Sequence, residues 1–171
     1  VLEFRILVPG SEAQYESEIK VLRDQGPRAK FGGKAWYKID KPEEFATGIT
    51  APYGDDSYVL AFTDPEHTLL AGSEAANWSL RDAQWLAGPT GYAVTFEFDE
   101  RGSLLFENLT RNNVDQPLCI LLDNVAISAP NIRQAISGRG EITGNFSQKE
   151  VQYLSDTLKA GSLPARLKPE P

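Results

Sequence analysis

The residue types that most often carry catalysis or bind metal ions are scarce in this chain of 171 residues. It contains one histidine, His67, and one cysteine, Cys119. A Ser-His-Asp triad would have to be built around His67 alone, and zinc sites of the usual cysteine and histidine type need more ligands than these two residues supply. We therefore expect no catalytic residue, no metal site and no cofactor, and an enzyme acting through His67 is the weakest functional alternative.

The surroundings of these two residues favour structural roles. Cys119 lies inside the apolar run Leu118–Leu122, where a buried strand position explains it better than a reactive thiol does. His67 closes the sequence Asp64-Pro-Glu-His67, which has the composition of a turn. A single cysteine cannot form a disulfide within the chain, so cysteine usage does not indicate the redox compartment.

The best candidate for a binding surface is the stretch from residue 28 to residue 41. It carries five basic residues against one acidic residue, with aromatic residues between them. Cationic and aromatic side chains together can hold a flexible or acidic polymer through charge and stacking. We expect the contacts to come from Lys34, Trp36, Tyr37 and Lys38. The alternative is that the two aromatic side chains pack into a small subdomain while the lysines are solvated.

Composition limits the classes to which the protein can belong. Hydrophobic residues make up 41% of the chain, enough for a conventional core, and 17 basic against 24 acidic residues give a net charge of -7. The negative charge disfavours binding to nucleic acid and to anionic lipid. No apolar run exceeds five residues, whereas a membrane-spanning helix needs about 20.

The chain contains no methionine and begins at Val1, already within a strand-like run. We therefore expect it to be part of a longer protein, in which a signal peptide or a membrane-spanning segment could lie outside the printed sequence.

In the first half of the chain, apolar and polar residues alternate within residues 1–8, which predicts a strand with Leu2, Phe4 and Ile6 on one face. A helix is predicted over residues 11–24, and short strands and turns over residues 28–91. The clearest of these short strands covers residues 58–63. Residues 79–85 fit either a short helical turn or a loop.

The second half has sharper signals. Strands are predicted at residues 94–98, 118–122, 125–128 and 141–143. Helices are predicted at residues 129–136 and 148–160, and a further helix that Asp99 can cap carries Leu104 to Leu109. Ser147 and Glu150 have the spacing of a capping box, which makes the last helix the best-defined element. Asp123 and Asn124 form a plausible two-residue hairpin turn because both tolerate positive φ. A final strand is predicted near residues 165–167.

This order of elements predicts an α+β fold, in which an antiparallel sheet carries helices on one face. We expect a ferredoxin-like base half plus a smaller inserted head subdomain of short strands. The base subdomain would comprise residues 1–8 and 92–171, and the head subdomain residues 9–91.

Several motifs of the second half occur together in a fixed order. They are Leu80-Arg-Asp-Ala83, Val94-Thr-Phe-Glu-Phe-Asp-Glu-Arg-Gly102, Ile120-Leu-Leu-Asp123, Ile127-Ser-Ala-Pro130, Gly140-Glu-Ile-Thr-Gly-Asn-Phe-Ser147 and Leu158-Lys-Ala-Gly-Ser-Leu-Pro164. With these motifs the segment from about residue 79 to 167 resembles the large extracytoplasmic region of the SecD family, accessory subunits of the bacterial Sec protein-export machinery. Residues 9–78 match that family by position only.

The resemblance implies a role in protein transport at the bacterial inner membrane, with this fragment on the periplasmic side. SecD-like proteins act with SecF beside the SecYEG channel and use the proton gradient to move preproteins forward. The proton-carrying groups of the family lie in transmembrane helices, so no residue of this chain is assigned to proton transfer. The base would then anchor the domain, and the head would contact an unfolded preprotein.

A second interpretation is a stand-alone extracytoplasmic module that captures a peptide or a lipid without any coupling to the export channel. Apolar segments of about 20 residues on both sides of this chain would favour the transporter over the module.

Overall fold

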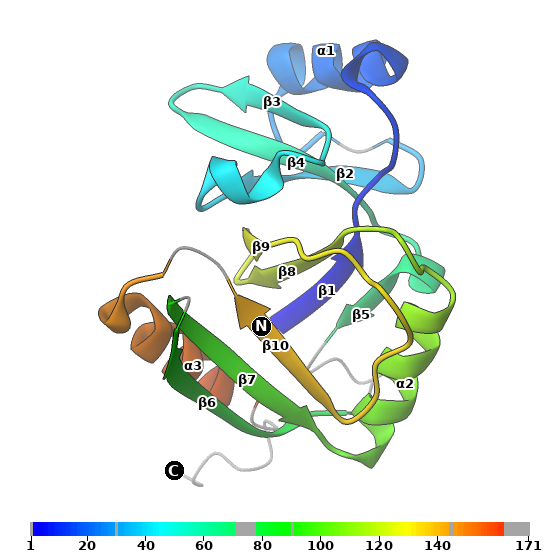
Figure 1. Ribbon diagram of the computed structural model, residues 1–171. Helices are drawn as coiled ribbons and strands as arrows, with labels where there is room; N and C mark the ends of the chain where they lie inside the picture. The colour runs from blue at the N-terminus through cyan, green and yellow to red at the C-terminus, as the bar shows by residue number, and fades with distance from the viewer. Residues whose placement is uncertain (1, 30, 71–77, 90, 144–145, 163–171) are drawn as a thin grey trace, which may run out of the picture.

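The computed structural model describes residues 2–29, 31–70, 78–89, 91–143 and 146–162, the last three of them as backbone only. These residues form two lobes, one above the other in Figure 1. The upper lobe comprises the described residues between 9 and 62, and the lower lobe comprises residues 2–6, 68–70 and the described residues between 78 and 162. A seven-stranded sheet with the order β3-β4-β2-β9-β8-β1-β5 runs through both lobes, and a three-stranded sheet, β10-β7-β6, belongs to the lower one.

The upper lobe is a small sheet covered by a helix. Its elements are η1 (Glu12–Tyr15), α1 (Glu16–Gln25), β2 (Lys34–Ile39), η2 (Pro42–Phe45), β3 (Thr50–Tyr53) and β4 (Asp56–Phe62). The predicted first helix is confirmed as η1 followed by α1, which ends at Gly26 with φ of 89°. Leu22 of α1 packs with Trp36 and Leu60 of the sheet, and this small core holds the lobe together.

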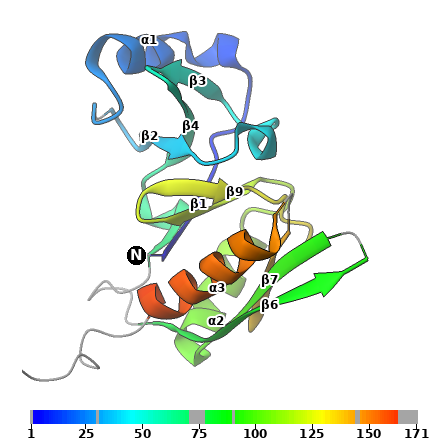
Figure 2. The same ribbon diagram turned by 90° about the vertical axis from the view of Figure 1, so that its left-hand side faces the viewer.

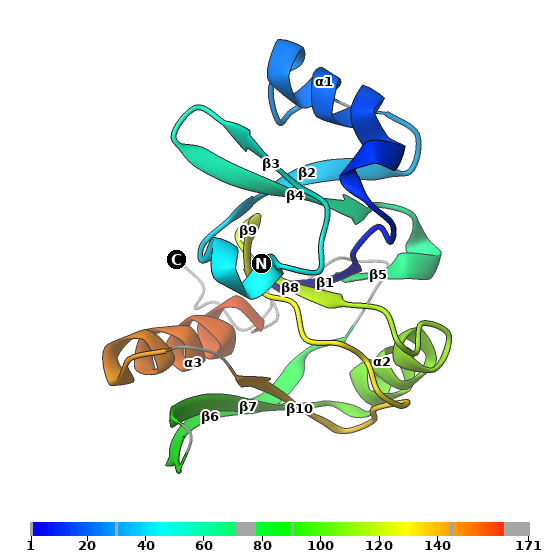
Figure 3. The same ribbon diagram turned by 45° about the horizontal axis from the view of Figure 1, so that its top comes forward.

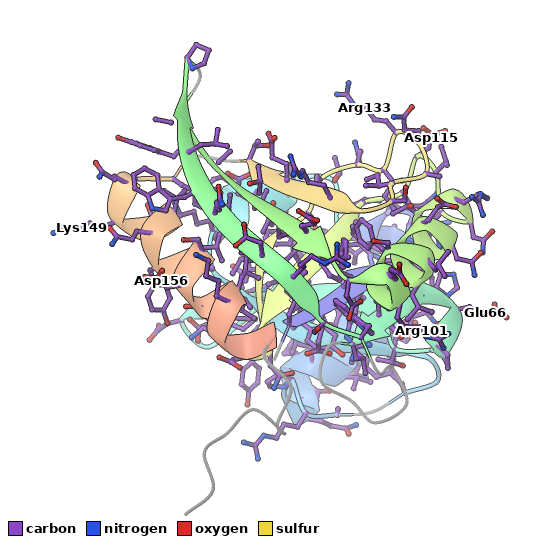
Figure 4. The ribbon with its side chains drawn as sticks, turned by 90° about the horizontal axis from the view of Figure 1, so that it is seen from below. Glu66, Arg101, Asp115, Arg133, Lys149 and Asp156 are labelled. Atoms are coloured by element: carbon purple, nitrogen blue, oxygen red, sulfur yellow. The ribbon has the colours of Figure 1, made fainter. Side chains whose placement is uncertain are left out.

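The lower lobe is a two-sheet structure with both long helices. Its strands are β1 (Leu2–Ile6), β5 (Thr68–Leu70), β6 (Leu80–Gly88), β7 (Gly91–Phe98), β8 (Leu118–Leu122), β9 (Val125–Ser128) and β10 (Arg139–Thr143). The helices are α2 (Glu100–Arg111) and α3 (Gln148–Ser162), and η3 (Pro65–His67) precedes β5. Seen from below, β6 and β7 cross the lobe between α3 on one side and α2 on the other (Figure 4).

The centre of the lower lobe is aromatic. Phe4 of β1 lies with its ring centre 4.9 Å from that of Phe106 and 5.8 Å from that of Phe96. Apolar side chains of α2, α3 and both sheets surround this centre. The alternation of Val94, Phe96 and Phe98 therefore predicted correctly which face of β7 is buried.

A third apolar cluster joins the two lobes, and we call it the joint cluster. Its members come from β8, β9 and the residue directly after β1 on one side, and from β2, η2 and β4 on the other: Leu7, Ile39, Phe45, Val59, Ala61, Cys119, Leu121 and Ala126. The seven-stranded sheet passes from lobe to lobe through a two-residue parallel pairing of β2 with β9, Lys38 with Val125 and Ile39 with Ala126. The sheet is therefore mixed rather than wholly antiparallel, within the α+β class that was predicted.

A buried ion pair lies on the same side of β1 as the joint. Arg5 Nη2 donates to Glu3 Oε1 at 2.6 Å, and Arg5 Nη1 donates to the carbonyl of Phe62 at 3.2 Å. The guanidinium also lies 5.2 Å from the ring centre of Tyr37. Since Phe62 and Tyr37 belong to the upper lobe, Arg5 connects the two lobes with polar contacts beside the apolar cluster.

Two sequence predictions were wrong. Residues 80–85 belong to strand β6, which Ser79 directly precedes, and a bulge between Leu80 and Asp82 breaks the alternation that would have revealed the strand. Residues 129–136 are not helical, since Ile132 N donates to the carbonyl of Gln116 at 2.9 Å and extends the chain alongside the start of β8. The burial of Ile132 in the lower core favours this extended path.

The predicted hairpin and last helix are confirmed. Asp123 and Asn124 have φ values of 49° and 68° and connect β8 to β9. At the start of α3, Ser147 and Glu150 form the reciprocal hydrogen bonds of a capping box. The strand predicted near residues 165–167 lies outside the described residues.

The strand pairing also bears on the expected division into base and head. β5 and β6 lie within residues 9–91, yet β5 pairs with β1 and β6 pairs with β7. Both strands are thus part of the lower lobe.

Candidate functional site

A groove of about 420 Å³ lies where α3 meets the β8–β9 hairpin and the end of β2. Figure 2 shows α3 running below this hairpin, with the cyan turn of η2 on the same side of the view as the orange start of α3, and Figure 3 shows η2 between β2 and α3. The lining is an apolar base with carboxylates around it: Asp40, Leu122, Asp123, Val125, Ile127, Phe146, Glu150, Tyr153, Leu154 and Thr157. Both lobes contribute, because Asp40 follows β2 and the other residues belong to the lower lobe.

The start of α3 fixes one wall of the groove. Glu150 Oε1 accepts a hydrogen bond from Ser147 N at 3.0 Å, and Ser147 Oγ accepts one from Glu150 N at 3.2 Å. One turn further on, Leu154 is buried while Tyr153 is 72% exposed at the groove. Lys149 points outward from the same end of α3 (Figure 4). An exposed aromatic side chain beside an apolar floor is typical of binding surfaces.

Lys41 contacts two residues of the groove, Glu150 and Phe146, from the upper lobe. Its Nζ lies 2.7 Å from Glu150 Oε2 and 5.0 Å from the ring centre of Phe146. The hydrogen bond from Lys41, followed by the bond from the Ser147 backbone, lowers the pKa of Glu150. Glu150 therefore stays ionised while one oxygen caps α3 and the other holds the ammonium group.

The four residues predicted to contact a polymer all lie on β2, but they do not share one surface. Strand alternation places Lys34, Trp36 and Lys38 on the face toward α1 and Tyr37 on the face toward the joint. Trp36 is 3% exposed, and its indole N–H donates to the carbonyl of Glu18 at 3.1 Å. Trp36 therefore packs into the upper lobe, as the alternative interpretation of this stretch predicted for its aromatic side chains.

The remaining three residues differ in environment. Tyr37 packs against the joint cluster, and burial raises the pKa of its hydroxyl. Lys34 is half-buried, whereas Lys38 is exposed, with its Nζ 3.7 Å from Asp56 Oδ2. Lys30, another basic residue of this stretch, lies outside the described residues. A contact role for Lys34, Tyr37 and Lys38 stays a prediction.

His67 and Cys119 occupy positions with structural partners. His67 Nδ1 lies 2.7 Å from Asp64 Oδ2, and its ring stacks on Phe62 at 4.2 Å. Thr68 lies beside it, with its hydroxyl donating to the carbonyl of Asp64 at 3.0 Å. Cys119 is fully buried in the joint cluster, and this burial raises the pKa of its thiol. The predicted strand position of Cys119 is confirmed.

Among the residues that the structure places, no three His, Cys, Asp or Glu side chains come together in a way that could hold a metal ion. Across the same described part of the chain, no helix combines the length and the apolar character needed to span a membrane.

Comparison with protein families identifies the chain. The family model described as SecDF, P1 head subdomain, matches residues 60–165. The chain belongs to the SecD/SecDF family. The resemblance based on the motifs between residues 79 and 167 is thereby confirmed. The family model's head subdomain includes residues that the sequence analysis assigned to the base.

Individual SecD relatives extend this match over nearly the whole chain. Protein translocase subunit SecD of Aquifex aeolicus is 45% identical over 167 residues, covering 98% of this chain and 28% of the relative. The SecD subunit of Elusimicrobium minutum is 31% identical over 169 residues, covering 98% of this chain and 34% of the relative. The chain thus spans about a third or less of these relatives.

A solved structure has a similar fold. It is described as a membrane component SecDF that enhances protein export, and it covers 99% of this chain and 68% of its own. The two share 27% identity with a TM-score of 0.54.

The buried position of Trp36 predicts a large loss of stability on truncation. We expect Trp36→Ala to lower the free energy of unfolding by about 3–5 kcal/mol, because it leaves a cavity in the upper lobe. Lys38→Ala, on the same strand, should cost less than about 1 kcal/mol because it removes an exposed ion pair. Urea unfolding measures both values. Similar losses for the two variants would contradict the assignment of Trp36 to the core.

The lowered pKa of Glu150 predicts a pH dependence. Because the folded-state pKa lies below the unfolded one, the stabilisation is complete above the unfolded value of about 4.3 and is lost as pH falls through the folded value. Glu150→Gln keeps an acceptor for the cap but loses the charge. Its melting temperature should therefore fall below that of the parent at neutral pH and converge with it in acid. If the melting temperatures of the parent and Glu150→Gln differed by the same amount from pH 7 to pH 2, the ionisation of Glu150 would not be the cause of the pH dependence.

Proposed function

We propose that this chain is the periplasmic part of a SecD-type export subunit and that it assists the passage of preproteins across the bacterial inner membrane. The observation that carries the proposal is the match to SecD of Aquifex aeolicus over 98% of the chain. The similar solved structure is described as a membrane component that enhances protein export. SecF and SecYEG are the proposed partners, and the proton gradient would act through membrane-embedded parts of the subunit.

The groove between α3 and the β8–β9 hairpin is the proposed contact with the exported chain. An unfolded polypeptide presents backbone and apolar side chains together, and its segments differ widely in sequence. An open groove with an apolar floor and an exposed tyrosine suits such a partner because apolar contact needs no fixed sequence. This assignment moves the main proposed contact from β2 to α3 and the hairpin.

We further propose that the two lobes act as one unit. The proposed division places residues 9–62 in the upper lobe and the remaining described residues below, in place of a boundary near residue 91. The joint cluster and the Arg5 contacts support this proposal, since both would have to break before the lobes could separate. Force or displacement applied at one lobe would then reach the other through a packed interface.

Site-specific photo-cross-linking tests the groove. A photoreactive residue at Tyr153 in the full-length subunit should cross-link to a preprotein halted during export, because Tyr153 lies on the groove. Leu104 on α2 is the matched control, with 67% exposure against 72% for Tyr153. We expect at least about a tenfold excess of cross-linking at Tyr153, equivalent to about 1.4 kcal/mol of preference. Equal yields at both positions would contradict the groove assignment.

A further inference from the structure

We propose that Glu150 and Phe146 form a subsite for a cationic side chain of the exported polypeptide, and that Lys41 occupies this subsite while the groove is empty. The inference rests on the proposed function and specifies which segments the groove favours. The ligand class is a lysine or arginine next to an apolar residue in an extended chain.

The position of the Lys41 ammonium group shows that the subsite accommodates a cation. A carboxylate oxygen lies 2.7 Å from Nζ, and the centre of an aromatic ring lies 5.0 Å from it. A carboxylate and an aromatic face together provide the two interactions by which proteins bind alkylammonium and guanidinium groups. Any incoming lysine would find the same two partners.

The subsite is held in place before any ligand arrives. Glu150 Oε1 accepts from Ser147 N, so the capping box orients the carboxylate and leaves Oε2 directed at the cation. A binding group fixed by a helix cap loses little conformational freedom when a ligand binds. The Glu150 side chain is also 43% exposed, whereas that of Lys41 is 18% exposed, so the carboxylate remains accessible beside its present partner.

The surroundings favour a basic ligand over an acidic one. Asp40 and Asp123 lie on the same groove, and both add negative charge near Glu150. The net charge of -7 acts in the same direction at longer range. Leu122, Val125 and Leu154 provide the apolar contacts for the residue next to the cation.

Lys41 acts in this proposal as an internal competitor. It directly precedes η2 in the upper lobe, and its flexible four-carbon stem allows the ammonium group to leave without a change of the backbone. Exchange of one cation for another preserves the charge balance of the subsite. The exchange also removes a link between η2 and α3, so occupancy of the groove weakens one contact between the lobes.

Peptide binding to the 171-residue chain tests the inference. The probe is a fluorescein-labelled, unstructured peptide with lysines next to leucines, and its counterpart has every lysine replaced by glutamate. Removing the internal competitor with Lys41→Ala should tighten binding of the lysine peptide about fivefold to tenfold, as expected when an ion pair and a cation–π contact no longer compete. Lys41→Arg should bind as the parent does, because arginine retains the competing cation.

Two further variants make the result specific. Phe146→Leu, added to Lys41→Ala, should reverse most of the gain because the aromatic face is lost. Lys20→Ala is the matched control, since it removes one positive charge from α1 and should leave affinity unchanged. A melting curve of each variant establishes that it is folded before its affinity is compared.

The outcomes separate the subsite from the proposed function. Equal gains for the lysine and glutamate peptides would overturn the cation subsite, while the groove would still bind polypeptide as proposed. An unchanged affinity in Lys41→Ala would overturn the competitor role of Lys41 and the subsite with it. If no variant bound either peptide, both the subsite and the groove assignment would fail.

Discussion

The arrangement of this molecule depends on the apolar packing that joins its two lobes. A seven-stranded sheet crosses between them through only two paired residues of β2 and β9, which is a short ladder for holding two lobes together. The joint cluster adds apolar contact between the lobes, with Leu7, Val59 and Leu121 all fully buried. Such packing fixes distances closely, because removal of even one methylene group is unfavourable. The geometry of the groove depends on this packing between the lobes. Asp40 and Lys41 belong to the upper lobe, whereas α3 belongs to the lower lobe.

Much of the local structure could be predicted because short-range chemistry determines it. The capping box at Ser147 and Glu150 specifies where α3 begins, and positive φ at Asp123 and Asn124 specifies the β8–β9 turn. Alternation identified the buried face of β7, and the motifs between residues 79 and 167 indicated the family that comparison confirmed. In each case the signal lies within a few consecutive residues or in an ordered series of them.

The features that could not be predicted arise from contacts distant in sequence. In β6, a bulge interrupts the alternation of buried and exposed residues by which a strand is recognised. At residues 129–136, hydrogen bonds to residues next to β8 favour an extended chain over the predicted helix. Trp36 was expected to contact a polymer because lysines flank it in the sequence, whereas α1 covers its side chain in the fold. The groove had no sequence signature, since its lining comes from three separate segments of the chain, around residue 40, residues 122–127 and residues 146–157. Glu150 was singled out beforehand for its role as a cap, and Asp123 for its place in the hairpin turn, but neither was assigned to a binding site.

Native-state hydrogen exchange in Leu121→Ala tests the central claim, that the joint cluster makes the lobes one cooperative unit. The account predicts that the slowest amides of β2 and β4 and those of β7 and β10 lose the same protection, about 2–5 kcal/mol. Leu104→Ala, which truncates a side chain 67% exposed, is the control and should leave both sets unchanged. Loss of protection confined to β7 and β10, with β2 and β4 unaffected, would contradict the account.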